Sequence, residues 1–152
     1  MKVRRMDHVG IIVDDLAAAK AFFLELGLEV LGEMDLEGEL VDKVTGLKGV
    51  RSSILMIGTP GGGTNLEFSK IHTHPDESGI QRLPANALGL RHVTFAVEDI
   101  EGIVAKLEKN GGELFSPIQN YNDVYKLCYM RGPEGIIVEL AGEIGTTSDS
   151  GE

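Results

Sequence analysis

The alternation of apolar and polar positions occurs twice along this chain of 152 residues. Residues 7–16 read DHVGIIVDDL and residues 91–100 read RHVTFAVEDI. Aligning their histidines also aligns Val9 with Val93, Val13 with Val97, Asp15 with Asp99 and Leu16 with Ile100. In each segment apolar residues alternate with small or polar ones, which predicts a β-strand with one buried face. The repeat indicates two copies of one structural unit.

A helix is expected after each of these two strands. Gly27 ends the first predicted helix and Gly111 the second, and both lie 19 positions after the histidine of their copy (27 − 8 and 111 − 92). Asp14 or Asp15 can cap the first helix. The predicted buried stripes consist of Leu16, Ala19, Phe23 and Leu26 in the first helix and of Ile100, Ile103, Val104 and Leu107 in the second.

Three further strands are predicted in each copy, while residues 36–50 are ambiguous. They lie near 28–35, 51–58 and 64–70 in the first copy and near 113–118, 123–131 and 136–141 in the second. These elements predict an α+β protein of two tandem βαβββ units whose mixed sheets curve around a shared metal-containing cavity. The units are expected at 1–70 and 89–141, joined by a loop at 71–88 and followed by a disordered tail at 142–152, in one structural domain.

Composition excludes several classes of partner. The net charge of −10 argues against nucleic acid and anionic membranes, which require clustered Lys and Arg. The single cysteine, Cys128, excludes an internal disulfide and is predicted to lie in the core. No apolar run reaches membrane-spanning length and no apolar signal segment follows Met1, so that a cytoplasmic protein is expected.

Strand alternation predicts a divided metal site. The strands NLEFS and IIVELA present apolar residues to the helix, so that Glu67 and Glu139 face the other way, as do His8 and His92. A divalent cation removes the cost of burying unpaired carboxylates. Two imidazoles and two carboxylates suit one ion of Zn²⁺, Ni²⁺, Co²⁺, Mn²⁺ or Fe²⁺, with an open position for water or substrate oxygens.

The segments DHVGIIVDDL, LRHVTFAVEDI and GPEGIIVEL resemble the vicinal oxygen chelate superfamily over about residues 5–141. That superfamily of paired βαβββ units includes glyoxalase I, methylmalonyl-CoA epimerase, extradiol dioxygenases, fosfomycin-modifying transferases and bleomycin-binding proteins. The resemblance matches His8, Glu67, His92 and Glu139 to the ligand set of bacterial-type glyoxalase I. It implies a metal-dependent lyase or isomerase that acts through an enediolate on a small substrate with vicinal oxygens, with Glu67 or Glu139 as the base. The segment FSKIHTHP after Glu67 departs from the LTYNWG-like segment of glyoxalases, so that glutathione use is not implied.

Two other functions remain open. An Fe²⁺ extradiol-type dioxygenase would use His8, His92 and Glu139 and leave Glu67 spare. An antibiotic- or metabolite-binding resistance protein would hold a flat ligand between subunits without turnover. In each case a homodimer is expected, because the concave sheet face that carries the histidine and glutamate of each unit requires a cover.

Weaker candidates for substrate contacts come from the same strands. Asn65 and Arg51 are candidates in the first copy, and His72 and His74 are expected to be solvated loop residues. In the second copy Tyr121, Tyr125, Tyr129 and Arg131 share parity along one predicted strand.

Overall fold

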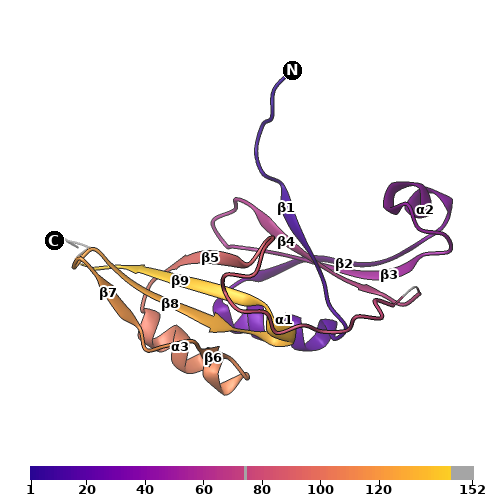
Figure 1. Cartoon of the computed structure of the whole chain (residues 1–152). Coiled ribbons are helices and arrows are strands. Elements are labelled where there is room, and N and C mark those ends of the chain that lie inside the picture. Colours follow the sequence, from indigo (N-terminus) through magenta and orange to yellow (C-terminus); the bar gives the residue numbers. More distant parts are fainter. Residues whose placement is uncertain (74, 145–152) are drawn as a thin grey trace. The chain divides into compact units, whose positions relative to one another are not determined.

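The computed structural model describes residues 1–73 and 75–144. The chain divides into two compact units, Met1–Gly79 and Ile80–Glu152. Each unit contains a strand, a helix and then further strands that complete a mixed sheet (Figure 1). The predicted α+β class and the tandem βαβββ units are therefore confirmed.

The first unit builds a four-stranded sheet in the order β1-β4-β3-β2. Strands β1 and β4 are parallel, whereas β2–β3 and β3–β4 are antiparallel. A short helix, α2, occupies the ambiguous segment between β2 and β3. The elements are β1 His8–Ile12, α1 Leu16–Leu26, β2 Glu29–Glu37, α2 Glu39–Thr45, β3 Arg51–Gly58 and β4 Asn65–Ile71.

Helix α1 covers one face of this sheet. Asp15 caps it by accepting a hydrogen bond of 3.0 Å from the backbone N–H of Ala18. Gly27 ends it with a φ of 115°, which favours a residue without a side chain. The buried ring of Phe23 lies 4.9 Å from that of Phe68 on β4, measured between centroids. Since neighbouring strand residues face opposite ways, the residues flanking Phe68 lie on the face that α1 leaves uncovered.

The cap of α1 provides a test of the local structure. We expect Asp15→Ala to lower the free energy of unfolding by about 1 kcal/mol, because the N–H of Ala18 loses its acceptor. Urea unfolding followed by circular dichroism measures the change. Asp15→Asn keeps an acceptor oxygen and should cost less; an equal loss in both variants would contradict this account of the cap.

The second unit repeats the arrangement with one strand more. Its sheet has the order β5-β9-β8-β6, with β7 paired to β8, and β5 is parallel to β9. Helix α3 packs near β9, since a Cβ on Gly142 would lie 3.4 Å from Ile100. The elements are β5 His92–Val97, α3 Ile100–Lys109, β6 Glu113–Leu114, β7 Gln119–Tyr121, β8 Tyr125–Arg131, a 3-10 turn at Pro133–Gly135 and β9 Ile137–Glu143.

Two sequence-based expectations need correction here. Tyr121 lies on β7 and not on the strand of Tyr125, because Asn122 and Asp123 adopt φ angles of 51° and 54° and turn the chain between them. The two tyrosines still share a face, as direct cross-strand partners. The predicted tail starts too early, because β9 continues to Glu143; residues 145–152 of that tail lie outside the described residues.

In the parts of the chain that the structure describes, no helix is long and apolar enough to span a membrane.

Candidate functional site

The first unit brings His8 and Glu67 together on the face that α1 leaves uncovered. In the parallel register of β1 and β4, His8 is opposite Asn65 and Gly10 is opposite Glu67. The histidine and the carboxylate are therefore diagonal neighbours on one face of the sheet. His8 Nε2 lies 3.4 Å from Glu67 Oε2, and both side chains are partly exposed.

The second unit repeats this pair in the same register. His92 is opposite Ile137 and Thr94 is opposite Glu139 on the parallel strands β5 and β9. His92 Nε2 lies 3.2 Å from Glu139 Oε2. The hydroxyl of Thr94 donates a hydrogen bond of 3.0 Å to the same carboxylate oxygen. The repeat in the sequence is thus a repeat of local geometry.

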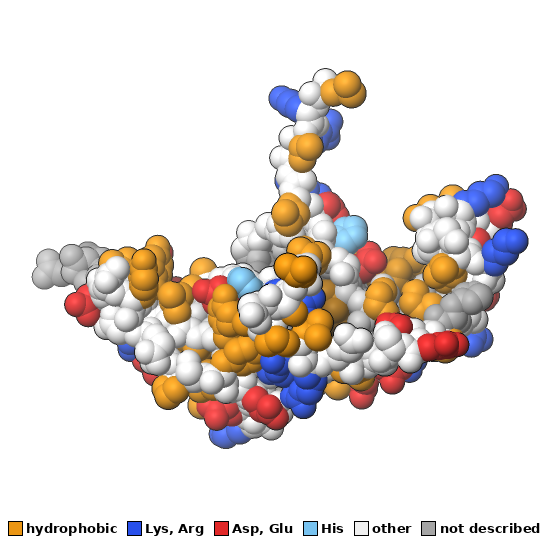
Figure 2. Space-filling model, in the orientation of Figure 1, with side chains coloured by type: hydrophobic (Ala, Val, Ile, Leu, Met, Phe, Trp, Pro, Cys, Tyr) orange, Lys and Arg blue, Asp and Glu red, His pale blue; other side chains and the backbone are white. Residues whose placement is uncertain are grey.

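The spacing within each pair suits adjacent ligands of one cation. Metal–ligand distances of about 2.0–2.2 Å place two such ligands about 3.0 Å apart at right angles and about 3.4 Å apart in a tetrahedral site. The His–Glu separations of 3.4 Å and 3.2 Å fall in this range. Among residues 1–73 and 75–144, no group of three or more His, Cys, Asp or Glu side chains could hold a metal ion. Figure 2 shows histidine surface, in pale blue, close to acidic side chains in red.

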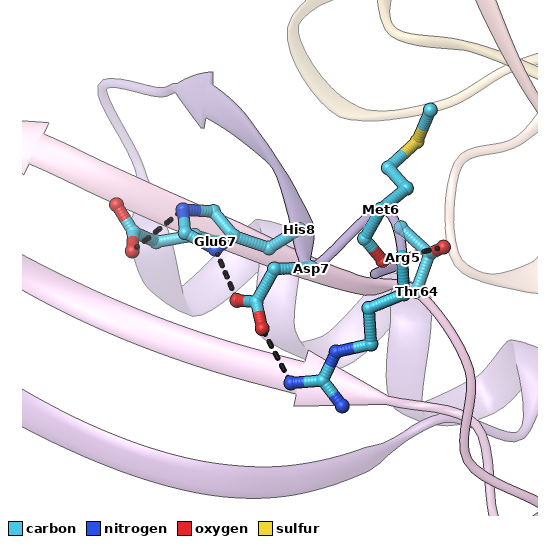
Figure 3. Close-up of polar contacts among 6 residues, drawn as sticks. All are labelled: Arg5, Met6, Asp7, His8, Thr64 and Glu67. Atoms are coloured by element: carbon cyan, nitrogen blue, oxygen red, sulfur yellow. Dashed lines mark hydrogen bonds and ion pairs between the residues drawn. The ribbon is translucent and has the colours of Figure 1, made fainter. Parts of the chain in front are cut away.

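A carboxylate orients the imidazole of His8. Asp7 Oδ2 lies 2.8 Å from His8 Nδ1, and Arg5 Nη2 donates to Asp7 Oδ1 at 2.7 Å (Figure 3). The hydrogen bond to Asp7 raises the pKa of His8, and the negative charge of Glu67 acts in the same direction, against partial burial. The pKa of Asp7 is lowered by its hydrogen bonds to His8 and Arg5.

An aromatic side chain lies beside the second pair instead. The ring of Tyr129 lies 5.0 Å from that of His92, and Tyr129 is the cross-strand partner of Glu139. Phe115 contacts Tyr129 edge-on at 6.0 Å between centroids. The guanidinium of Arg131 lies 4.7 Å from the centre of the Phe115 ring. This pair therefore borders a surface suited to a planar ligand.

A profile of the Glyoxalase/Bleomycin resistance protein/Dioxygenase superfamily matches residues 5–140. The chain belongs to this superfamily. The match includes both histidines and both glutamates of the two pairs. The expected resemblance to the vicinal oxygen chelate superfamily is therefore confirmed.

Relatives of this superfamily member match at least 90% of its length. It is 43% identical to a glyoxalase family protein from Bacillus cereus, whose solved structure it matches with a TM-score of 0.92 over 95% of this chain and 97% of that one. It is 28% identical to the uncharacterized protein YwbC of Bacillus subtilis (strain 168), over 90% of this chain and 96% of that protein. Glyoxalase I from Zea mays is similar in fold, with 17% identity and a TM-score of 0.65 over 93% of this chain and 46% of the maize chain.

In the first unit of this superfamily member, the other predicted substrate-contact residues lie at different positions relative to the His8–Glu67 pair. Asn65 lies directly opposite His8 and shares its face. Arg51 lies on the other face of β3, because Met56 is the direct partner of Glu67 and alternation places odd-numbered residues opposite. His72 contacts the hydroxyl of Ser53 at 2.7 Å, and His74 lies outside the described residues.

In the second unit, Tyr129 is the candidate that reaches the histidine–glutamate pair. Arg131 donates hydrogen bonds to the backbone carbonyls of Leu83 and Gly135, so that it also holds two loops together. Tyr121 and Tyr125 lie on the exposed hairpin of β7 and β8. Cys128 is buried, as predicted, and burial raises the pKa of its thiol.

Three residues near the pairs were not predicted as site residues. Thr94 shares the parity of His92, so that strand alternation could have identified it. Asp7 directly precedes His8, but its contact depends on the path of the chain before β1. Phe115 follows a two-residue strand, β6, and its contact with Tyr129 carried no signal in the sequence.

A cavity of about 440 Å³ is lined by no residue of either pair. It lies between α1 and strands β2 and β3, on the helix-covered face of the first sheet. An ion pair of 2.9 Å joins Lys20 to Glu33 in its wall. Lys20 and Glu33 satisfy each other, and Asp35, which also lines the cavity, accepts a hydrogen bond from Ser53.

Proposed function

We propose that the protein is a cytoplasmic, metal-dependent lyase or isomerase of glyoxalase type. The observation that supports this most directly is the His–Glu pair in equivalent register in both units, with nitrogen–oxygen separations of 3.4 Å and 3.2 Å. In this proposal one divalent cation takes its protein ligands from His8, Glu67, His92 and Glu139.

The donor set suits a catalytic rather than a closed structural metal. Two imidazoles and two carboxylates favour Zn²⁺, Ni²⁺, Co²⁺, Mn²⁺ or Fe²⁺ over ions that require thiolates or oxygen ligands alone. A bound cation would supply the positive charge that holds two adjacent substrate oxygens and acidifies the neighbouring C–H group. The substrate class is therefore an α-hydroxycarbonyl or a similar small molecule with vicinal oxygens.

Glu67 is the better placed of the two carboxylates to remove the proton. Glu139 accepts a hydrogen bond from Thr94, which holds this carboxylate in place. Gly10 occupies the position opposite Glu67 that corresponds to Thr94, and the space beside it is open. Glu67 is also the more exposed, at 26% against 20% for Glu139. We therefore assign Glu67 as the general base and Glu139 as the more permanent ligand.

Metal analysis of protein purified without chelator tests the proposal. The expected result is one divalent ion for each set of four ligands, removable by a chelator. Transfer of a C–H proton of an α-hydroxycarbonyl substrate to solvent, followed by deuterium incorporation, should depend on that ion. Metal-free protein that exchanges the proton equally well would overturn the assignment, and oxygen uptake with catechols would replace it with a dioxygenase.

A binding function without turnover is the second candidate. The aromatic surface formed by Tyr129 and Phe115 beside His92 favours it, because planar ligands stack on such side chains. Tight binding of a planar antibiotic by metal-free protein, without any change in the ligand, would favour this function over the enzyme.

We also propose that the protein acts as a homodimer. Ile12 and Met34 lie on the pair-bearing face of the first sheet, and 64% and 55% of their surfaces are exposed. Exposed apolar side chains on the face that carries the ligands favour a cover by another protein surface. Sedimentation should give twice the mass of the chain at micromolar concentration. A monomer that still binds metal and substrate would contradict this expectation.

A further inference from the structure

The segment before β1 is held against the start of β4. The backbone N–H of Asn65 donates to the carbonyl of Asp7 at 3.0 Å, and the hydroxyl of Thr64 donates to the carbonyl of Met6 at 3.1 Å. Figure 3 shows Met6 and Thr64 beside the polar chain formed by Arg5, Asp7, His8 and Glu67. The position of Asp7 is therefore determined by the sheet.

From this position Asp7 determines which nitrogen of His8 carries the proton. An ionised carboxylate accepts hydrogen bonds and donates none, so that the contact of 2.8 Å requires a proton on Nδ1. The lone pair of the neutral imidazole then lies on Nε2, the nitrogen that points toward Glu67. Arg5 holds the other oxygen of Asp7 at 2.7 Å and so limits rotation of the carboxylate.

The Arg5–Asp7 ion pair is expected to add little to the stability of the fold. Arg5 and Asp7 expose 72% and 58% of their side chains, and ion pairs at such exposure contribute little to folding. The second copy has no equivalent of Asp7 before its histidine. Arg91 stands before His92, and a guanidinium cannot accept a hydrogen bond. The repeat therefore preserves the ligand but not its orienting carboxylate.

We propose that Asp7 is a positioning residue that presents the Nε2 lone pair of His8 to the metal. Arg5 supports it by fixing the carboxylate. The assignment rests on the metal site proposed above. It makes the two histidine ligands differ in how their rings are oriented: a carboxylate orients His8, whereas His92 is placed by its strand and by Tyr129.

The test combines a measurement on metal-free protein with one on metal binding. Nitrogen-15 NMR of the histidine rings, at a pH well above the ordinary histidine pKa of about 6.5, should show His8 protonated on Nδ1. In Asp7→Ala the acceptor is absent, so this variant should lose the preference for the Nδ1–H form; Asp7→Asn keeps an uncharged acceptor oxygen beside a competing amide donor and should lose less of it. The signal of His92 in the same samples is the internal control, and His8→Ala identifies the signal of His8.

Metal affinity, titrated with Zn²⁺, should fall by about 10–100-fold in Asp7→Ala, the usual effect of losing a partner of a metal ligand. Glu37→Gln removes the same charge from an exposed position of β2 and should leave affinity unchanged. An unchanged ring tautomer, or unchanged affinity in both Asp7 variants, would overturn the role of Asp7. Absence of Zn²⁺ binding by the unmodified protein would instead refute the metal site, and the tautomer measurement alone would then decide whether Asp7 orients His8.

Discussion

Replacing Glu67 by Gln is expected to reduce turnover by about two to four decades while the fold is kept. This is the usual range for the loss of a general base, since an amide oxygen can still reach a cation but cannot accept the proton. Glu67 is partly exposed on β4 and its neighbours Leu66 and Phe68 form the core, so that the substitution leaves packing intact. Steady-state kinetics with a substrate that carries vicinal oxygens, together with metal analysis, measures the effect.

The matched control for this prediction is Glu139→Gln. It should lower metal content more than Glu67→Gln does, because Thr94 holds the carboxylate of Glu139 in place. A larger loss of turnover at constant metal content in Glu139→Gln would transfer the role of base to Glu139. If Glu67→Gln leaves both metal binding and activity intact, the glyoxalase-type mechanism is wrong and a dioxygenase with the ligands His8, His92 and Glu139 becomes the better account.

Replacing His92 by Ala is expected to remove most of the bound metal. The substitution deletes one ligand and leaves Glu139 without its partner at 3.2 Å. The loss of affinity should exceed the 10–100-fold typical of a residue that only supports a ligand. In unmodified protein a metal concentration of about 100 Kd should add about 2.7 kcal/mol to the free energy of unfolding, and this gain should vanish in His92→Ala.

His72→Ala provides the matched histidine control. His72 contacts Ser53 and lies outside both pairs, so that its removal should leave metal content and metal-dependent stabilisation unchanged. Equal metal loss in the two variants would show that the ion binds elsewhere. Unchanged metal content in His92→Ala would exclude His92 from the ligand set.

Much of the fold was predictable because its signals are local. The apolar spacing and the bounding residues Asp15 and Gly27 predicted α1, which the structure places at Leu16–Leu26. Strand alternation also placed Glu67 and Glu139 opposite the helix faces, since side-chain direction in a strand has a period of two residues. The pairing of each His with a Glu follows from the same parity in two parallel strands.

Elements without a strong period were harder to predict. Helix α2 is short and buries no residue, so that residues 36–50 carried no apolar stripe. The strand predicted at 113–118 is only the two-residue strand β6 in the structure. A turn at Asn122 and Asp123 separates β7 from β8, because both residues adopt the left-handed conformation that Asn and Asp tolerate. Such choices depend on backbone conformation that hydrophobic periodicity does not encode.

The sequence by itself determined the two-copy architecture, the boundaries of α1 and the face of the sheet that each histidine and glutamate occupies. Tertiary structure decided which residues contact each pair. Asp7 contacts His8 because the chain before β1 is hydrogen-bonded to β4. Thr94 contacts Glu139, and Tyr129 contacts His92, because the sheet brings their strands together. The physical reason is the range of the interactions. Periodicity and caps act over one turn of helix or two residues of strand, whereas these contacts depend on segments as much as 58 residues apart, as Asp7 and Asn65 are (65 − 7).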